Sequence, residues 1–361
     1  MCHRIAVIPG DGVGREVVAE GLKALDALAA GISGLAFEYT MFDWGSERHL
    51  REGAMMPADG LDLLRRMDAI YLGAVGDPRL PDHVTLHGLL LPIKMGFDLY
   101  VGLRPACLYP GVTSVLAGKK GGEIDLVVVR ENTEGEYADL GGIVGQGGQE
   151  TAVQAGLFTR RGVERIVRFA FELARTRRRL MTSVTKSNAQ KYGMVLWDRV
   201  VREVAAEFPD VTAESRLVDA AAMDLVRRPE HYDVSVASNL FADILSDLAA
   251  GITGGMGVAP GASFRRDRGA PGLFDPVHGS APDIAGQGLA NPVAAILTAR
   301  MMLEYLGEAQ AAEVLHEAVR QNLREGRVRT PDLGGSASTA EVGDDIARRV
   351  QELLTLPDRA S

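Results

Sequence analysis

Short apolar runs alternate along the chain with longer stretches in which apolar and polar positions follow a helical period. The short runs, each of which predicts a buried strand, occupy residues 4–9, 68–73, 125–130, 180–185 and 233–237. Apolar side chains recur at helical spacing in residues 16–30, 163–174 and 293–301. Strands that alternate with helices in this way predict an α/β architecture with a largely buried sheet.

Residues 140–154 break this alternation, because they contain closely spaced glycines and no helical period. Such a segment is either a disordered linker or a β-hairpin arm. Alternating and β-branched residues, such as Ile143 and Val153, flank its central turn. We therefore favour a hairpin arm over about residues 138–156, since arms of this kind suit exchange between the subunits of a dimer.

The basic run at residues 175–179 (RTRRR) follows the predicted helix at 163–174. It is either a basic patch or a solvated turn. Positive charge is favourable at the C-terminus of a helix, so we expect a solvated turn that complements the helix dipole.

Length and composition limit the class of protein. The 361 residues suggest two domains, or one domain with a large elaboration, and 46% hydrophobic residues suffice for a sizeable core. With 39 Lys and Arg against 48 Asp and Glu, the formal net charge is −9, which argues against a general nucleic-acid binder. The acidic excess is either solvated surface or, in part, a cluster of carboxylates that holds a cation.

The two cysteines, Cys2 and Cys107, lie far apart, which favours a reducing compartment and argues against a disulfide framework. No run approaches the roughly 18 to 20 apolar residues of a membrane helix. The apolar run at the N-terminus reaches Pro9 too early for a signal peptide. We therefore expect a cytoplasmic protein with neither a membrane nor a nucleic acid as partner.

The glycine-rich loop at residues 9–14 (PGDGVG) invites comparison with nucleotide-binding loops. Its spacing is not that of the dinucleotide fingerprint, and no acidic residue closes a second strand about 20 positions later. No Gly-Lys-Ser/Thr follows, so the loop is not a phosphate-binding P-loop either. A structural turn between a strand and a helix is the better interpretation.

Two aspartates stand four positions apart just after the predicted strand at 233–237. On a helix, Asp243 and Asp247 project from the same face, where like charges repel unless water or a cation separates them. The apolar residues around the pair weaken the alternative of a solvated helix face. A hard divalent cation, Mg²⁺ or Mn²⁺, is the expected occupant. Asp219 is a candidate third ligand, with Asp224 as its local rival.

Several cationic and proton-transferring side chains lie at or near the predicted ends of elements. Arg104, Arg130 and Lys94 suggest a di- or tricarboxylate substrate, because clustered guanidinium groups bind carboxylates bidentately. Lys186 follows a buried strand, where desolvation favours the neutral amine and lets it act as a base. Tyr137 is a candidate proton donor. Taken alone, each is more readily explained as an ordinary surface or structural residue.

In combination, these motifs resemble those of the metal-dependent β-decarboxylating dehydrogenases, the family of isocitrate, 3-isopropylmalate, homoisocitrate and tartrate/D-malate dehydrogenases. The matching segments are IPGDGVGREV from residue 8, GLRP at 102–105, VVRENTEGEY at 128–137, TKSN at 185–188, SNLFADILSD at 238–247 and GLFDPVHGSAPDIAGQGLANP at 272–292. The resemblance therefore runs nearly from end to end.

This resemblance implies the fold of isopropylmalate dehydrogenase, with two α/β domains, an active-site cleft between them and no Rossmann fingerprint. The first domain would comprise residues 1–98 and 252–361, with the NAD-binding loop. The second, residues 99–251, would carry the dimer interface, the arm and the metal-binding carboxylates.

The resemblance also implies roles for the candidate residues. Asp243 and Asp247 would bind Mg²⁺ or Mn²⁺ together with Asp219 from the partner subunit. Lys186, also from the partner, would deprotonate the C2 hydroxyl while hydride passes to NAD⁺, and the metal would stabilise the enolate as CO₂ departs. Tyr137 would protonate the carbanion. The family's active unit is a dimer, so we expect a homodimer with shared active sites, with a tetramer left open.

The family binds NAD without a Rossmann fingerprint. The residues that the resemblance assigns to the cofactor are His278, Gly279, Ser280, Ala281, Asp283, Ile284 and Asn291. Asp283 discriminates between cofactors, because a carboxylate accepts hydrogen bonds from a ribose 2′-hydroxyl and repels a 2′-phosphate. Members that use NADP carry Lys-Tyr in place of this Asp-Ile pair. We therefore predict NAD.

The substrate carboxylate would be held by Arg104 and Arg130. Lys94 departs from the family pattern, since it occupies the place of an arginine that helps to clamp the substrate. Lysine keeps the charge and loses the planar fork, so the change is not conservative for a bidentate contact. Either the substrate differs from that of the typical members, or a water completes the contact.

The segment at residues 77–100 resembles the tartrate/D-malate branch, particularly in PDHVTL at 81–86. His87 stands where isopropylmalate enzymes usually carry Glu, whereas Leu90 remains at the position that lines their alkyl pocket. We expect NAD- and metal-dependent oxidative decarboxylation of a D-malate-like 2-hydroxy acid. The alternative is a dehydrogenase of 3-isopropylmalate or another C3-substituted malate. A non-catalytic regulatory subunit is a weaker alternative, because the candidate base, acid and metal ligands are all present.

Overall fold

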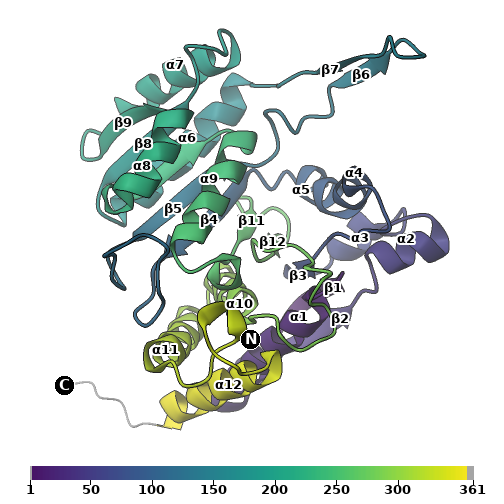
Figure 1. Cartoon of the computed structure of the whole chain (residues 1–361), viewed down its shortest axis with the longest axis vertical. Helices are drawn as coiled ribbons and strands as arrows, with labels where there is room; N and C mark the ends of the chain where they lie inside the picture. Colours follow the sequence, from purple (N-terminus) through teal and green to yellow (C-terminus); the bar gives the residue numbers. More distant parts are fainter. Residues whose placement is uncertain (1, 356–361) are drawn as a thin grey trace. The chain divides into compact units, whose positions relative to one another are not determined.

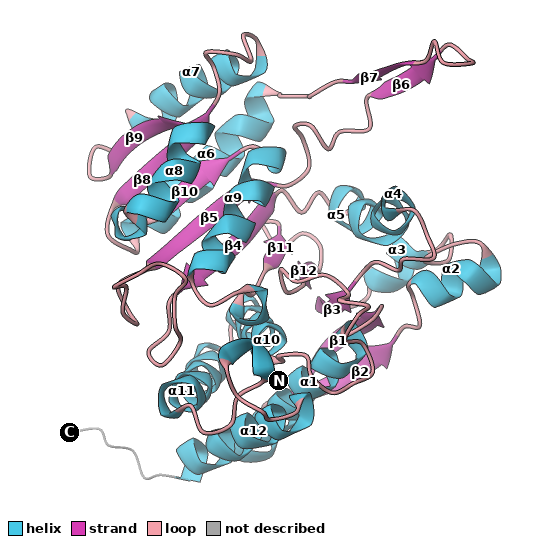
Figure 2. Cartoon of the chain, viewed as in Figure 1, coloured by secondary structure: helices cyan, strands magenta, loops and turns pink. Residues whose placement is uncertain are grey.

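The computed structural model of the chain describes residues 2–355, in which strands and helices alternate (Figures 1 and 2). They form two compact units. Of the described residues, unit 1 comprises 2–99, 107–124 and 250–355, and unit 2 comprises 100–106 and 125–249. The α/β class predicted from the sequence is confirmed.

Residues 107–124, which the sequence analysis placed in the second domain, cluster with unit 1. Two hydrogen bonds close the segment on itself, from Leu108 N to the carbonyl of Ile124 at 2.9 Å and from Gly122 N to the carbonyl of Leu108 at 2.7 Å. Arg329 of unit 1 donates to the carbonyl oxygen of Gly111 at 2.6 Å. This contact holds the segment against the C-terminal part of unit 1.

Unit 1 contains a sheet with the strand order β2-β1-β3-β12-β11, in which only β11 pairs antiparallel with its neighbour β12. Its strands are β1 (Cys2–Gly10), β2 (Ala36–Met41), β3 (Ala69–Ala74), β11 (Ala262–Phe264) and β12 (Gly272–Phe274). Its helices are α1 (Gly14–Gly31), α2 (Ser46–Glu52), α3 (Gly60–Leu64), α4 (Asp82–Thr85), α5 (Leu91–Gly96), α10 (Val293–Leu306), α11 (Ala309–Glu325) and α12 (Thr339–Thr355), with helical turns η1 (Leu86–Leu90), η3 (Met256–Val258) and η4 (Pro331–Leu333).

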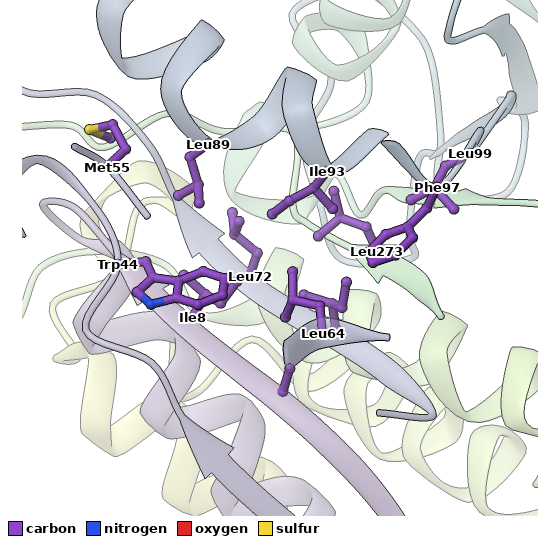
Figure 3. Packing of buried hydrophobic residues seen from close by; sticks show 12 residues of the cluster. Ile8, Trp44, Met55, Leu64, Leu72, Leu89, Ile93, Phe97, Leu99 and Leu273 are labelled. Atoms are coloured by element: carbon purple, nitrogen blue, oxygen red, sulfur yellow. The ribbon is translucent and has the colours of Figure 1, made fainter. Parts of the chain in front are cut away.

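Apolar residues on both faces of this sheet explain why unit 1 folds in layers. Ile8 and Leu72 pack with Trp44, Leu89 and other buried side chains in a hydrophobic cluster on one face (Figure 3). Successive side chains of a strand point to opposite faces. Tyr71 accordingly lies on the other side, where its hydroxyl donates to the carbonyl of Ala295 in α10 at 2.8 Å. The sheet is therefore covered on both sides, as near-parallel sheets require.

Unit 2 contains a second run of strands in the order β4-β5-β10-β8-β9, with β5, β10, β8 and β9 mutually parallel. The strands are β4 (Val101–Cys107), β5 (Asp125–Glu131), β8 (Leu180–Thr185), β9 (Thr212–Leu217) and β10 (Val234–Ala237). The helices are α6 (Arg160–Arg175), α7 (Gly193–Ala205), α8 (Val218–Arg227) and α9 (Asn239–Ile252), with a helical turn η2 (Pro229–His231). No helix within residues 2–355 has the length and apolar character needed to cross a membrane.

The glycine-rich segment after Tyr137 forms the predicted hairpin. Its strands β6 (Gly141–Val144) and β7 (Thr151–Gln154) pair antiparallel, with Gly142 opposite Val153. Every residue of both strands is exposed, and Figure 1 shows the hairpin extending away from the α/β body of unit 2. The segment is thus a hairpin and not an irregular linker, and its role as an arm between subunits stays a prediction.

The basic run at residues 175–179 is a largely exposed turn after α6, as predicted, and it also pairs with a buried acid. Arg177 Nε donates to Asp233 Oδ1 at 2.8 Å, and the backbone N–H of Arg178 donates to Asp233 Oδ2, also at 2.8 Å. Asp233 is completely buried just before β10. A buried carboxylate must be paired, and the basic run supplies its partners.

Candidate active site

The ends of two neighbouring strands in unit 2 bring an arginine, a tyrosine and two aspartates together. Arg130 is near the end of β5, and Asp243 and Asp247 lie one turn apart on α9, which follows β10. Because β5 and β10 are parallel neighbours, the residues after their carboxyl ends meet at one edge of the sheet. Arg130 Nη1 pairs with the Asp243 carboxylate, and the Tyr137 hydroxyl donates to Asp243 Oδ2 at 2.6 Å.

Asn239, the first residue of α9, connects this cluster to the loop that carries Tyr137. Its Oδ1 accepts from Arg130 Nε at 2.7 Å, and its Nδ2 donates to the carbonyl of Glu134 at 3.0 Å. Asn239 is 1% exposed, so both bonds are shielded from water. Nothing in the sequence pattern singled out Asn239 beyond its place in the SNLFADILSD segment.

The electrostatics of the cluster favour a bound cation. The pKa of Asp247 is raised, first by burial and then by the neighbouring Asp243 carboxylate, while Arg104 and Arg130 oppose the shift. Burial and the hydrogen bond to Asp243 also raise the pKa of Tyr137 to about 12, so its hydroxyl keeps its proton at neutral pH. Two carboxylates that repel each other supply the hard oxygen ligands that Mg²⁺ and Mn²⁺ prefer.

Lys186 and Asp219 form a separate pair at the edge of unit 2. Lys186 directly follows β8, and its Nζ donates to Asp219 Oδ1, in the first turn of α8, at 2.6 Å. This hydrogen bond lowers the pKa of Asp219. The rival Asp224 is occupied elsewhere, since it accepts from Arg228 Nη2 at 2.7 Å.

One copy of the described chain does not bring the three predicted metal ligands, Asp219, Asp243 and Asp247, together. Within residues 2–355, no group of three or more His, Cys, Asp or Glu side chains is arranged to hold a metal ion. The structure therefore brings Asp243 and Asp247 together and leaves Asp219 with Lys186.

In unit 1, the predicted cofactor loop borders a cavity of about 360 Å³. The cavity is lined by Val13, Val17, Met256, Gly257, His278, Gly279, Ala281, Ile284, Leu289, Ala290, Asn291 and Asp332. Five of the seven predicted cofactor residues are in this lining, whereas Ser280 and Asp283 are not. The walls combine apolar side chains with a few polar groups, which is typical of a site for a planar organic molecule.

Backbone contacts hold this loop against the start of α1. The N–H of Val13 donates to the carbonyl of Ser280 at 2.8 Å. Gly12 is required there, because its φ is +52° and a Cβ would lie 2.0 Å from the same carbonyl oxygen. Glu16 accepts hydrogen bonds from the N–H groups of Gly286 at 2.5 Å and Gly288 at 2.9 Å. The glycine-rich loop is thus a structural turn, as predicted, and it also supports the cofactor loop.

Polar groups of the cavity are oriented by short contacts. Asn291 Nδ2 donates to Asp332 Oδ2 at 3.0 Å, while Asn291 Oδ1 accepts from the N–H of Val293 at the start of α10. His278 Nδ1 donates to the carbonyl of Gly279 at 3.0 Å, and burial lowers the pKa of the imidazole. His278 is therefore neutral at pH 7. Asp332 lies in the helical turn η4, which is too short to show a period in the sequence, and sequence patterns therefore did not identify it.

The other predicted substrate residues lie in and beside the π-helical turn η1. His87 is exposed, whereas Leu90 is partly buried against the hydrophobic cluster of unit 1. The Lys94 side chain is 5% exposed, and its Nζ lies 3.9 Å from Asp275 Oδ2. Lys94 thus sits in a buried ion pair within unit 1.

Glu131 fixes the turn between Arg130 and Tyr137. Its buried carboxylate accepts hydrogen bonds from the N–H of Glu134 at 2.6 Å and from the hydroxyl of Thr133 at 2.9 Å. Burial outweighs these bonds and raises the pKa of Glu131 to about 7, from an ordinary value of 4.5. Between these two pH values the folded chain binds a proton at Glu131 that the unfolded chain has released.

This difference predicts a pH dependence of stability. The contribution of Glu131 is fully present below pH 4.5 and is lost as the pH rises through 7. We expect the free energy of unfolding of the wild type, relative to Glu131→Gln, to fall by about 2 kcal/mol between pH 5 and pH 8. Urea unfolding of both chains at the two pH values measures this quantity. A pH-independent difference would show that the Glu131 pKa is not raised.

Known proteins are similar to this chain over nearly its whole length. The family model for isocitrate/isopropylmalate dehydrogenase matches residues 4–346. A probable tartrate dehydrogenase/decarboxylase of Agrobacterium vitis is 49% identical over 96% of this chain and 98% of that protein. The D-malate dehydrogenase (decarboxylating) of Escherichia coli K12 is 48% identical, again over 96% and 98%.

Solved structures show the same fold. The crystal structure of isocitrate dehydrogenase from Methylococcus capsulatus superposes with a TM-score of 0.88 and 36% sequence identity. The match covers 97% of this chain and 99% of that one. Among sequence relatives, the tartrate dehydrogenase/decarboxylase of Pseudomonas putida is 47% identical over 97% of this chain and 98% of that protein.

Proposed function

The chain belongs to the isocitrate/isopropylmalate dehydrogenase family, and from this premise we propose that it catalyses the NAD-dependent, divalent-metal-dependent oxidative decarboxylation of a D-malate-like 2-hydroxy acid. The observation that carries the proposal is the meeting of Arg130, Tyr137 and Asp243 in one cluster. It combines a carboxylate-binding cation, a proton donor and a metal ligand. The full-length similarity to tartrate and D-malate dehydrogenases supports the choice of substrate class.

Asp243 and Asp247 fit a divalent cation, because their oxygens are hard ligands and the pKa of Asp247 is raised by burial and by the Asp243 carboxylate, both of which a cation would offset. The partner subunit's Asp219 would complete the ligand set. Bound there, the cation would act as a Lewis acid on the substrate oxygens. Arg104 and Arg130, both buried, would orient the substrate carboxylate beside these aspartates.

Two proton transfers are assigned to side chains of the protein. The partner subunit's Lys186 would take the proton of the C2 hydroxyl while hydride passes from C2 to NAD⁺. The bond between C3 and its carboxylate would then break, CO₂ would leave, and the electron pair of that bond would stay on C3, which Tyr137 would protonate. Tyr137 suits this role because its pKa of about 12 keeps the hydroxyl protonated until a strongly basic carbon forms.

A shared active site requires a homodimer, and exposed apolar side chains support one. Ile143, Val144 and Val153 of the arm are exposed, as are Met223 on α8 and Ile244 on α9. Ile244 directly follows Asp243 in the sequence. A second copy of the chain would cover such exposed apolar side chains.

The cofactor is proposed to be NAD, bound by the loop from His278 to Asn291 and the cavity that it borders. The exposed Asp283 carboxylate would accept hydrogen bonds from a ribose 2′-hydroxyl and repel a 2′-phosphate. A clear preference for NADP in steady-state rates would refute this part of the proposal.

Initial rates with D-malate, tartrate, 3-isopropylmalate and isocitrate, each with Mn²⁺ and NAD, test the substrate class. We expect D-malate or tartrate to give the highest kcat/KM. A preference for 3-isopropylmalate would favour the alternative substrate, and a strict preference for isocitrate would refute both. Binding of NAD without turnover of any malate derivative would indicate a regulatory subunit instead.

Glu16→Gln is expected to weaken NAD binding about tenfold with little change in kcat, because the amide cannot accept from both Gly286 and Gly288. Fluorescence titration with NAD and the split between KM and kcat measure the effect. Glu38→Gln, an exposed glutamate on β2, is the matched control. Equal effects of both variants would exclude a specific role for Glu16 in holding the loop.

A further inference from the structure

A second cavity in unit 1, of about 670 Å³, takes no part in the reaction proposed above. Residues from four segments form its walls: the start of β1, the turn before β3, the loop between β11 and β12, and the end of α10. Its charged and aromatic lining residues include Arg4, Arg65, Asp68, Arg268 and Tyr305. A cavity of this volume is in the range of small-molecule sites.

This cavity lies at the amino ends of the unit 1 strands, whereas the cofactor cavity lies at the carboxyl end of β1. β1, β3 and β12 run parallel and begin at Cys2, Ala69 and Gly272, so the residues before and at these positions border their amino ends. Val13, which lines the cofactor cavity, follows the carboxyl end of β1. Occupation of one cavity therefore does not block the other.

The acidic group of the lining is already neutralised. Asp68 accepts hydrogen bonds from the backbone N–H of Arg4 at 2.8 Å and from Arg4 Nη2 at 3.1 Å. Apart from this pair, the charged side chains of the lining are Arg65 and Arg268. His3, which also lines the cavity, is bound to Glu308 at 2.7 Å. The cavity is thus locally cationic in a chain whose formal net charge is −9.

Arg268 rests on an aromatic ring. Its guanidinium carbon lies 5.1 Å from the centroid of Tyr305, whose hydroxyl donates to the carbonyl of Ala270 at 2.9 Å. The adjacent acid, Asp267, is bound by Arg265 Nη2 at 2.7 Å. Arg268 also has a φ of +53°, in the left-handed region that non-glycine residues seldom adopt. The backbone strain and the ring contact together place this guanidinium at the cavity.

Arg65 has a similar setting on the other wall. Its guanidinium carbon lies 5.2 Å from the centroid of Phe97, which is buried. Arg65 Nε is 3.9 Å from Asp62 Oδ1, and both of these side chains are more than half exposed. A guanidinium stacked on a ring keeps its in-plane N–H groups available for an oxyanion.

We propose that this cavity is a binding site for a small dianion, carrying a phosphate group or two carboxylates, with Arg65 and Arg268 as its principal binding residues. The pair supplies two planar donors, and planar donors bind phosphate and carboxylate oxygens bidentately. Their aromatic supports reduce the side-chain entropy that binding would otherwise cost. The site does not depend on the proposed reaction.

Titration calorimetry of the full chain with inorganic phosphate and, separately, with succinate tests the proposal and distinguishes the two kinds of dianion. We expect saturable binding of at least one of them. Arg65→Gln and Arg268→Gln should each weaken it at least about tenfold, as loss of a charge-assisted contact predicts. Arg66→Gln and Arg265→Gln remove the same charge from neighbouring residues outside the lining, and they should change the affinity less than about twofold.

The exposed Cys2 in the lining locates the bound dianion. The rate of its alkylation by iodoacetamide, measured by mass spectrometry with Cys107 as internal reference, should fall when the dianion is bound. Saturable binding that leaves the Cys2 rate unchanged would place the dianion elsewhere and overturn the proposal. So would an absence of saturable binding at millimolar concentrations, or equal losses in the four arginine variants. Because Arg65 and Arg268 lie on different segments, one variant still tests the site if the other does not fold.

Discussion

Asp243→Asn is expected to lower the turnover of D-malate by at least about a thousand-fold and to leave the fold intact. The change removes a negative charge that the proposed cation needs, and the amide, with one oxygen, cannot accept from both Arg130 and Tyr137 as the carboxylate does. The Asp243 side chain is 42% exposed, so its loss should cost the folding free energy less than about 1 kcal/mol. Calorimetric titration with Mn²⁺ and urea unfolding measure the two effects separately.

Asp210→Asn is the matched control for this prediction. Asp210 is an exposed aspartate of unit 2 that pairs with Arg175, at a distance of 2.5 Å, and belongs to none of the proposed sites. It should leave both turnover and Mn²⁺ affinity unchanged. If Asp243→Asn lowered stability as strongly as it lowered Mn²⁺ affinity, Asp243 would be a structural residue and the metal site would be wrong.

Lys186→Met is expected to lower kcat by a factor of about 10² to 10⁴, the usual contribution of a general base. Substrate and Mn²⁺ affinities should change much less, because Lys186 accepts a proton and does not hold the cation. Lys191→Met removes a nearby lysine whose contact is the ring of Tyr192, and it should leave kcat unchanged. A loss of activity in both variants would point to a general effect of charge.

Mixing two inactive variants tests whether each site uses two chains. In a dimer of one Lys186→Met chain and one Asp243→Asn chain, one site would contain both changes and the other would contain neither. Random assembly would make half of the dimers hybrid, so about a quarter of the wild-type activity should return on mixing. A mixture that stays inactive after subunit exchange would exclude the shared site.

Much of the fold could be predicted from the sequence where a local pattern decides it. The apolar run at residues 180–185 coincides with β8, because a buried strand needs little more than consecutive apolar or small residues. The arm could be recognised because its glycines and alternating residues form a hairpin by themselves. In both cases the information lies within about ten neighbouring residues.

Contacts between distant segments could not be predicted in this way. Arg177 and Asp233 are 56 positions apart, and they meet only because β8, β10 and β5 are neighbours in the sheet. The basic run therefore looks solvated in the sequence, although its charge is needed by a buried acid.

Within the candidate site, residues whose type or spacing indicates a chemical role could be identified from the sequence. The residues that hold them in position could not. The spacing of Asp243 and Asp247 indicates a shared helix face by itself. Asn239 and Asp332, by contrast, act through an orientation that depends on their partners, Arg130 and Asn291. Residue spacing alone left Asp219 and Asp224 as alternatives, and the family resemblance favoured Asp219; in the structure, Asp224 pairs with Arg228.

The most direct test of the proposed reaction is to measure NADH and CO₂ together from D-malate, with NAD and Mn²⁺. The account predicts that the two products form in equal amounts, that chelation of the metal stops both, and that Asp243→Asn forms neither at a comparable rate. NADH formation without CO₂, or formation of both after the metal has been removed, would contradict it.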